Sequence, residues 1–242
     1  MEQWNDPTFA RAWTEDNSEK PHSLLREQQL DLLIAMVRTH CVAAGLRPHI
    51  LDLGCGPGIV AARMLDAIAG STYVGVDASP PMLAMAQTRL EPYTGRYALG
   101  QADFEAMTPE QLPGGPFGAA IAVQAIHNCS DEGKQRAYAS ARAVLAPGGL
   151  FVLSDRMRIV TPALFPAYLS VWDSLDKQPA QQGWQHTEGR SFGEHAQSVA
   201  ERGDRPGSLE QNLLWLREAG FAEVAAVHVV GIRAIIVAVA QL

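Results

Sequence analysis

The sequence predicts an α/β protein with a seven-stranded, mostly parallel sheet, helices on both faces and an antiparallel C-terminal hairpin. Three observations predict this fold class. Between residues 49 and 153, apolar β-type runs alternate with helical segments, as in a parallel sheet with crossover helices. The runs are continuously apolar, as expected for strands covered on both faces. The last two β-type runs, 223–230 and 234–240, are joined by too few residues for a crossover and must be antiparallel.

The composition is that of one globular domain. The chain has 242 residues, 47% of them apolar, and 26 acids against 19 bases give it a net charge of −7. Nucleic-acid binding depends on neutralising phosphates, so this balance disfavours DNA or RNA as the main partner. The sequence has no run of about 18 apolar residues, so no membrane span is expected. Three cysteines without paired spacing and a polar N-terminus predict a cytoplasmic protein of unknown oligomeric state.

Two helices are expected before the first strand, and together they form a predicted N-terminal helical cap, residues 1–44. The polar segment 1–20 carries scattered aromatic residues, including Trp4 and Trp13, which favours an amphipathic helix folded over another part of the chain. The segment 23–44 has apolar residues at helical spacing and stops at Gly45.

The predicted core, residues 45–155, contains the five parallel strands. They are expected at about 49–53, 72–76, 97–101, 119–123 and 150–153. Helices are expected at about 59–69, after Ser79 and at about 131–145. Ser79 is a suitable N-cap and Pro80 suits the first helical position.

The regular alternation stops between residues 156 and 207, which we predict to be an inserted lid. This segment contains Trp172 and Trp184, one helix near 162–176 and no clear strand. Regular structure returns with a capping-box pattern at Ser208, and residues 208–242 are expected to form the final helix and hairpin.

A glycine loop follows the first strand, in the stretch Leu51-Asp52-Leu53-Gly54-Cys55-Gly56-Pro57-Gly58. Ligands of open α/β sheets bind at the carboxyl ends of the strands, so this loop predicts the ligand site. Dinucleotide-binding proteins need Gly-x-Gly-x-x-Gly, whereas the third position here is Ile59. The loop also lacks the Gly-Lys-Ser/Thr of a Walker loop. Asp77 still fits the acid that binds ribose, which favours a nucleoside without a phosphate chain.

Further motifs follow this loop in a characteristic order. They are Gly75-Val76-Asp77-Ala78-Ser79-Pro80-Pro81-Met82-Leu83, Ala102-Asp103-Phe104, Leu145-Ala146-Pro147-Gly148-Gly149-Leu150 and Leu216-Arg217-Glu218-Ala219-Gly220-Phe221. In this order the sequence resembles the class I S-adenosylmethionine-dependent methyltransferases of the small-molecule type, over roughly residues 45–155 and 208–242. The resemblance implies a Rossmann-like fold and S-adenosylmethionine as the cofactor.

The resemblance also implies a cofactor site at the strand ends. The implied residues are Asp52, Gly54, Cys55, Gly56, Gly58, Asp77, Ala78, Met82, Ala102, Asp103, Phe104 and Gln124. In this assignment Asp52 faces the methionine ammonium, Asp77 accepts from both ribose hydroxyls and Asp103 accepts from the adenine amino group. Ala78 and Met82 flank the adenine, and the glycines let the backbone approach the ligand. Arg26 and Gln29 are candidates for the methionine carboxylate, with a surface role as the alternative.

His127 is the predicted catalytic residue, because it follows the fourth strand and a histidine can accept a proton near neutral pH. A structural histidine is the alternative. His186, Glu188 and His195 in the predicted lid are alternative bases. No metal is expected, because the chain lacks zinc-ligand spacing and the fourth strand lacks the acid that metal-dependent relatives use, which also disfavours Asp155 as a ligand.

The predicted function is methyl transfer to a small organic molecule, with oxygen as the first choice of acceptor atom and nitrogen or carbon left open. Two alternatives remain at this point. One is methylation of tRNA or another macromolecule, and the other is binding of S-adenosylmethionine without methyl transfer, because fold alone does not define function.

Overall fold

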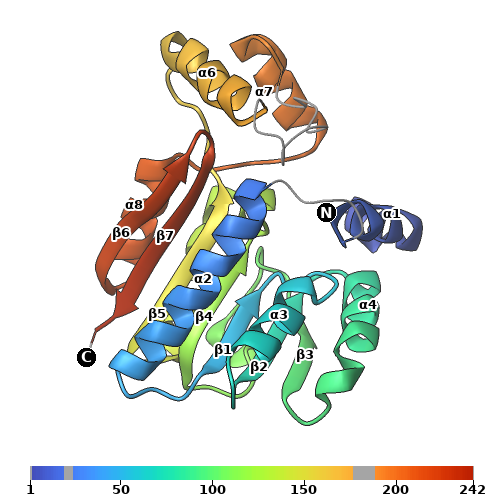
Figure 1. The fold of residues 1–242 in the computed structure, drawn as a ribbon, viewed down its shortest axis with the longest axis vertical. Coiled ribbons are helices and arrows are strands. Elements are labelled where there is room, and N and C mark those ends of the chain that lie inside the picture. Colours follow the sequence, from blue (N-terminus) through green and yellow to red (C-terminus); the bar gives the residue numbers. More distant parts are fainter. Residues whose placement is uncertain (1, 19–23, 177–188, 242) are drawn as a thin grey trace.

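A computed structural model describes residues 2–18, 24–176 and 189–241 (Figure 1). Its strands are β1 (His49–Leu53), β2 (Thr72–Asp77), β3 (Tyr97–Gln101), β4 (Phe117–Val123), β5 (Leu145–Arg156), β6 (Phe221–Val230) and β7 (Arg233–Ala240). Its α-helices are α1 (Pro7–Ser18), α2 (Leu24–Ala43), α3 (Ile59–Ala67), α4 (Pro80–Leu90), α5 (Asp131–Val144), α6 (Phe165–Asp176), α7 (Phe192–Glu201) and α8 (Leu209–Glu218). Short 3-10 helices are η1 (Glu2–Asn5), η2 (Glu91–Tyr93), η3 (Pro109–Gln111), η4 (Ile126–Asn128) and η5 (Pro162–Leu164).

The seven strands form one sheet in the order β3-β2-β1-β4-β5-β7-β6. The pairs from β3 to β5 are parallel, and β7 is antiparallel to both β5 and β6. This arrangement confirms the predicted fold class. Because the strand order reverses between β1 and β4, the crevice beside their carboxyl ends is the expected ligand position.

Helices cover both faces of the sheet, and the central strand β1 supplies side chains to both. Ile50 packs with residues of α2 and α3 on one face, whereas its neighbour Leu51 packs with residues of α5 and α8 on the other. Every residue from Ile50 to Leu53 is buried. The continuous apolar strands of the sequence therefore reflect two packed layers rather than one.

The helix starts that position the crevice have local causes in the sequence. The Ser79 hydroxyl accepts from the Met82 N–H at the start of α4, with prolines in the first turn. The Ser208 and Gln211 side chains form a reciprocal capping box at the start of α8. Both helices begin where the sequence patterns predict.

Strand β5 is longer than the predicted 150–153. It begins at Leu145, where it pairs with Phe117, and continues after a register shift to Arg156. The antiparallel partner β7 keeps β5 paired as far as the Arg156–Arg233 pair. The Pro147-Gly148-Gly149 turn that we expected is thus part of an irregular strand, and residue 156 belongs to the sheet.

The helices α6 and α7 stand beyond the β6–β7 hairpin at one end of the molecule (Figure 1). Phe165 and Trp172 of α6 form a small apolar cluster with Ile159 and Ile232. The predicted helix near 162–176 is present as η5 and α6, whereas α7 was not predicted. Trp184 lies outside the described residues.

The N-terminal segment lies beside α4 (Figure 1). The Ser79 hydroxyl donates to the Trp4 carbonyl at 2.5 Å, so η1 is fixed next to the start of α4. Trp4 also contacts Phe9 and Trp13 edge-on, at ring-centroid distances of 5.1 and 5.6 Å. In the part of the chain that the structure describes, no helix is long and apolar enough to cross a membrane.

Candidate active site

Two adjacent cavities lie at the carboxyl edge of the sheet. The first, of about 670 Å³, is bounded by the loops after β1, β2, β3 and β4, and we call it the cofactor cavity. The second, of about 400 Å³, is bounded by residues after β4, at the end of β5 and after α7, and we call it the acceptor cavity. The two share wall residues Trp4, Trp13, Arg26, Gln124 and Asn128.

The glycine loop is held to the end of β2 by Asp77. One carboxylate oxygen of Asp77 accepts from the Gly56 N–H at 2.9 Å, and the other accepts from the Ser79 N–H at 2.9 Å. Burial raises the pKa of the Asp77 carboxyl, and the hydrogen bonds from Ser79 and Gly56 oppose that shift. The carboxylate lies in the wall of the cofactor cavity with both oxygens oriented by backbone donors.

Asp52 is buried at the base of the same cavity. Its Oδ2 accepts from the Tyr73 hydroxyl, whereas Oδ1 has no hydrogen-bond partner. Burial raises the pKa of Asp52 to about 7, with a smaller contribution in the same direction from the Asp77 charge. A buried carboxylate oxygen without a donor is costly and favours a ligand that brings a positive charge or an N–H group.

Most predicted cofactor residues lie in the wall of this cavity. They are Asp52, Gly54, Cys55, Gly56, Asp77, Ala78, Met82, Asp103, Phe104 and Gln124. Asp103 is exposed and accepts from the Glu105 N–H at 3.0 Å. Burial raises the pKa of the Cys55 thiol well above its usual value, so this cysteine is a neutral wall residue.

Gly58 and Ala102, also predicted to bind the cofactor, are not among the residues that line this cavity. A Cβ on Gly58 would approach the Ala86 Cα to 3.2 Å, so this glycine allows α3 and α4 to pack closely. Ala102 is buried, and its N–H donates to the Asp77 carbonyl at 3.1 Å. We therefore assign both residues a supporting role.

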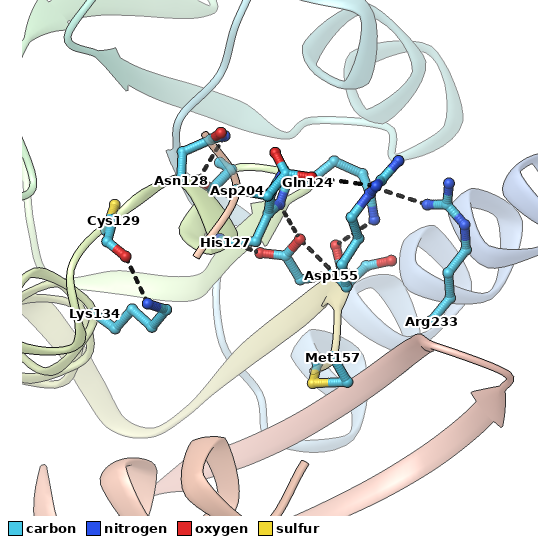
Figure 2. A network of polar contacts seen from close by, with 12 residues as sticks. Gln124, His127, Asn128, Cys129, Lys134, Asp155, Met157, Asp204 and Arg233 are labelled. Atoms are coloured by element: carbon cyan, nitrogen blue, oxygen red, sulfur yellow. Dashed lines mark hydrogen bonds and ion pairs between the residues drawn. The ribbon is translucent and has the colours of Figure 1, made fainter. Parts of the chain in front are cut away.

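His127 lies in the wall of the acceptor cavity, between two carboxylates (Figure 2). Its Nδ1 is 2.5 Å from Asp155 Oδ1, and its backbone N–H donates to Asp155 Oδ2 at 2.9 Å. Its Nε2 is 3.7 Å from Asp204 Oδ1. All three side chains are less than a tenth exposed, so the imidazole has one orientation.

Arginine side chains surround the same cavity, and our sequence analysis missed three of them. Arg156 and Arg202 contact Asp204 Oδ2 at 3.3 and 2.9 Å, and Arg233 donates to the Gln124 amide oxygen at 2.8 Å. Asp155 and Arg156 end β5, so the strand-end rule that identified Asp77 also applies to them. Asp204 and Arg233 have no comparable local signal.

Of the remaining candidate residues, Arg26 lies at the cavities, whereas Gln29 and His195 lie elsewhere. Arg26 lies in the walls of both cavities, and burial lowers the pKa of its guanidinium. Gln29 is buried elsewhere and contacts the His228 ring at 3.5 Å. His195 packs in the cluster with Phe165 and Trp172, away from both cavities. His186 and Glu188 lie outside the described residues. Within the described ranges, no three His, Cys, Asp or Glu side chains are grouped to hold a metal ion.

We expect Gly54→Ala to destabilise the protein more than Gly56→Ala. Both glycines have positive φ, but a Cβ on Gly54 would collide with the Ala125 side chain, whereas a Cβ on Gly56 would meet nothing within 4 Å. The shared cost of a left-handed alanine is about 1–2 kcal/mol, and the collision adds to it only at Gly54. Thermal unfolding of the two variants measures the difference, and equal melting temperatures would contradict this account of the loop.

The fold and the cofactor cavity define a Rossmann-like nucleoside-binding protein. Residues 50–149 match the family model described as a methyltransferase domain. An uncharacterized methyltransferase of Mycobacterium tuberculosis is 33% identical over 141 residues, which are 57% of this chain and 66% of the relative. A malonyl-[acyl-carrier protein] O-methyltransferase of Pseudescherichia vulneris is 31% identical over 157 residues, which are 65% of this chain and 55% of the relative.

Among solved structures, the magnesium protoporphyrin IX methyltransferase of Synechocystis, determined with bound S-adenosylhomocysteine, has the same fold. It superposes with a TM-score of 0.63 at 17% identity and covers 99% of this chain and 97% of that protein. The chain belongs to the class I S-adenosylmethionine-dependent methyltransferases, and its cofactor is S-adenosylmethionine.

The cofactor cavity fits this molecule. The lone Asp52 Oδ1 suits the methionine ammonium, and the volume of about 670 Å³ lies in the range of small-molecule sites. Asp77 would hold the ribose, and Arg26 is the cation best placed for the methionine carboxylate.

Proposed function

We propose that this protein transfers the methyl group of S-adenosylmethionine to a hydroxyl oxygen of a small organic molecule in the acceptor cavity. The proposal is carried by the His127–Asp155 pair, which lies in the wall of a cavity adjacent to the cofactor cavity. S-adenosylmethionine supplies a methyl group that its sulfonium already activates. The protein must therefore position the acceptor and remove one proton.

His127 acts as the general base in this proposal. We assign the Nδ1 proton to the contact with Asp155, which leaves the Nε2 lone pair to accept a proton. The hydroxyl oxygen forms the new C–O bond as the methyl–sulfur bond breaks, and the hydroxyl proton moves to Nε2. Asp155 and Asp204 then stabilise the positive imidazolium from opposite sides.

Two further observations support a small acceptor. The acceptor cavity holds about 400 Å³, and the net charge of −7 disfavours an RNA substrate. The name of the P. vulneris relative favours oxygen as the acceptor atom. We assign enclosure of the acceptor to the N-terminal cap and to the segment after α7, because Trp4 and Trp13 of the cap and Asp204 of that segment lie in the cavity wall.

The cysteines support a cytoplasmic location within this proposal. Cys41, Cys55 and Cys129 are all buried free thiols, which suits a reducing compartment.

Transfer of a deuterated methyl group tests the function. The protein is incubated with S-adenosylmethionine labelled in its methyl group and with a cell extract, which is then separated into small molecules, RNA and protein. We expect the label in a small-molecule methyl ether, with S-adenosylhomocysteine formed in equal amount. Label only in RNA or protein would overturn the proposal. Tight cofactor binding without S-adenosylhomocysteine would identify a non-methylating protein instead.

Once the labelled acceptor is identified, kcat can be measured with it. We expect His127→Gln to lower this kcat roughly 100- to 10,000-fold, as for loss of a general base. Cofactor affinity should stay the same, because His127 lies outside the cofactor cavity wall. His40→Gln is the matched control, since that ring contacts the Gly148 carbonyl outside both cavities. An unchanged kcat would make His127 a structural residue.

A further inference from the structure

We propose that the methyl acceptor is a phenol, and that the rings of Trp4, Phe9 and Trp13 bind its aromatic ring in the acceptor cavity. This inference rests on the proposed methyl transfer and adds the chemical class of the acceptor. It also gives η1 and α1 a role in substrate specificity that the transfer reaction itself does not require.

The first argument is the chemical composition of the acceptor cavity wall. Among the described residues of this wall, the apolar side chains are Trp4, Phe9 and Trp13, and all three are aromatic. The other described wall residues are polar or charged. A small-molecule site contacts the apolar body of its ligand with apolar side chains and orients the ligand with a few polar groups. Here the apolar body of the acceptor would contact aromatic rings.

The second argument is the choice of buried side chains in α1. Ala10 is 0% exposed and Thr14 is 8% exposed, whereas Phe9 and Trp13 are only partly buried. Rings that served only to anchor α1 would be buried first, because large aromatic side chains remove the most apolar area from water. The helix instead buries its small residues and leaves the large rings partly exposed at a cavity. An apolar ligand on these rings would remove the remaining area from water.

The third argument is the arrangement of the three rings. Trp4 contacts Phe9 and Trp13 edge-on, with ring centroids 5.1 and 5.6 Å apart. Aromatic rings prefer edge-to-face and offset contacts, so a further ring would join the cluster in the same geometry. Trp4 and Trp13 also lie in the cofactor cavity wall, and the Ser79 hydroxyl fixes the Trp4 backbone there. An aromatic acceptor on these rings would therefore lie next to the methyl donor.

The fourth argument is the match between a phenol and the proposed base. His127 lies in the polar part of the same cavity wall. A phenol hydroxyl has a pKa of about 10, as in tyrosine, and loses its proton much more readily than an aliphatic hydroxyl. The phenol oxygen bonds to the methyl carbon as the methyl–sulfur bond breaks, and the proton moves to His127 Nε2. The products are an aryl methyl ether, S-adenosylhomocysteine and a protonated imidazole.

Binding of simple hydroxyl compounds tests the site without turnover. The aromatic 4-methylphenol and the aliphatic 4-methylcyclohexanol have nearly the same size. Each is titrated into the protein saturated with S-adenosylhomocysteine, with binding followed by calorimetry. We expect 4-methylphenol to bind roughly 10-fold more tightly, because contacts between rings add to the effect of area burial. Equal binding of the two compounds, or no binding of 4-methylphenol, would refute the aromatic site.

Variants of Phe9 separate ring recognition from packing of α1, because Phe9 lies only in the acceptor cavity wall. Phe9→Leu removes the ring but keeps an apolar side chain, so it should weaken 4-methylphenol binding roughly 3- to 10-fold. Affinity for S-adenosylhomocysteine should stay the same. Phe9→Tyr keeps the ring and should retain 4-methylphenol binding. Tyr168→Leu is the matched control, because that ring contacts Trp172 outside both cavities. Equal loss of both ligands in Phe9→Leu would assign the ring to packing and overturn the inference.

The extract experiment separates this inference from the proposed function. The labelled product should be an aryl methyl ether, and Phe9→Leu should raise the KM for its phenol precursor with little effect on kcat. Labelling of an aliphatic hydroxyl would refute the aromatic site and leave methyl transfer to a small molecule intact. Absence of any methylated small molecule would instead refute the proposed function.

Discussion

We expect Asp52→Asn to raise the melting temperature of the cofactor-free protein and, at the same time, to weaken S-adenosylmethionine binding. Asp52 is buried, its Oδ1 has no partner, and burial raises its pKa to about 7. Above that pH the folded protein holds a charge that the unfolded chain would hydrate. Each pKa unit corresponds to about 1.4 kcal/mol, so removal of the charge stabilises the protein by roughly 2–4 kcal/mol at pH 8.

The sign of the pH dependence follows from the same shift. Because the folded pKa lies above the usual 3.8, the folded state binds more protons than the unfolded state between these values. The contribution of Asp52 to stability is therefore fully present below pH 3.8 and is lost as the pH rises towards 7. Asp52→Asn should remove this decline, whereas the exposed Asp66→Asn should keep it.

Cofactor affinity should show the opposite trend. The methionine ammonium requires the ionised carboxylate, so affinity in the wild type should rise with pH up to about 7 and then level off. Thermal unfolding from pH 4 to 8 and calorimetry with S-adenosylhomocysteine measure the two effects. A lower melting temperature for Asp52→Asn at pH 8 would mean that the carboxylate stabilises the fold.

Asp77→Ala should weaken S-adenosylhomocysteine binding at least 100-fold. The assigned carboxylate accepts from two ribose hydroxyls, and a hydrogen bond to a charged group contributes about 1.5–3 kcal/mol. The substitution also releases the Gly56 and Ser79 N–H groups that shape the loop. Asp77→Asn keeps acceptor oxygen at one position and should show an intermediate loss.

Asp103→Ala is the comparison for this effect. Asp103 lies in the same cavity wall but is exposed, so its single predicted bond to the adenine amino group competes with water. We expect a loss of about tenfold or less. Calorimetry of the three variants gives the order directly, and equal affinities for Asp77→Ala and the wild type would refute the ribose assignment.

The parts of the fold that could be predicted from the sequence are those coded by local patterns. The strands His49–Leu53 and Tyr97–Gln101 have the predicted bounds. The helix Phe192–Glu201 was missed because its segment has few apolar residues and only His195 in it is buried. The start of β5 was missed because Pro-Gly-Gly is typical of a turn, whereas Leu145 pairs with Phe117 of β4. The end of β5 was missed because pairing with β7 extends the strand to Arg156.

The candidate site likewise contains a part that local sequence patterns predict and a part that they do not. The cofactor cavity is built from consecutive strand ends, so residues such as Asp52 and Asp77 follow a spacing that one sequence reveals. The acceptor cavity joins His127, Asp204 and Arg233, which are far apart in the chain and come from different elements. His127 follows a strand and was predicted, but only the folded arrangement brings Asp204 and Arg233 to the same cavity, so no local pattern could identify those two.

The pairing of Arg156 with Arg233 has a consequence for the composition of the acceptor cavity wall. Side chains alternate between the two faces of a sheet with a period of two residues. Insertion of one residue at the Gly231–Ile232 turn would shift β7 by one position and rotate Arg233 to the opposite face. The cofactor cavity, built from the parallel strands, would stay the same. The register of the hairpin therefore decides which β7 side chain lies in the acceptor cavity wall, independently of the parallel strands that bear the cofactor cavity.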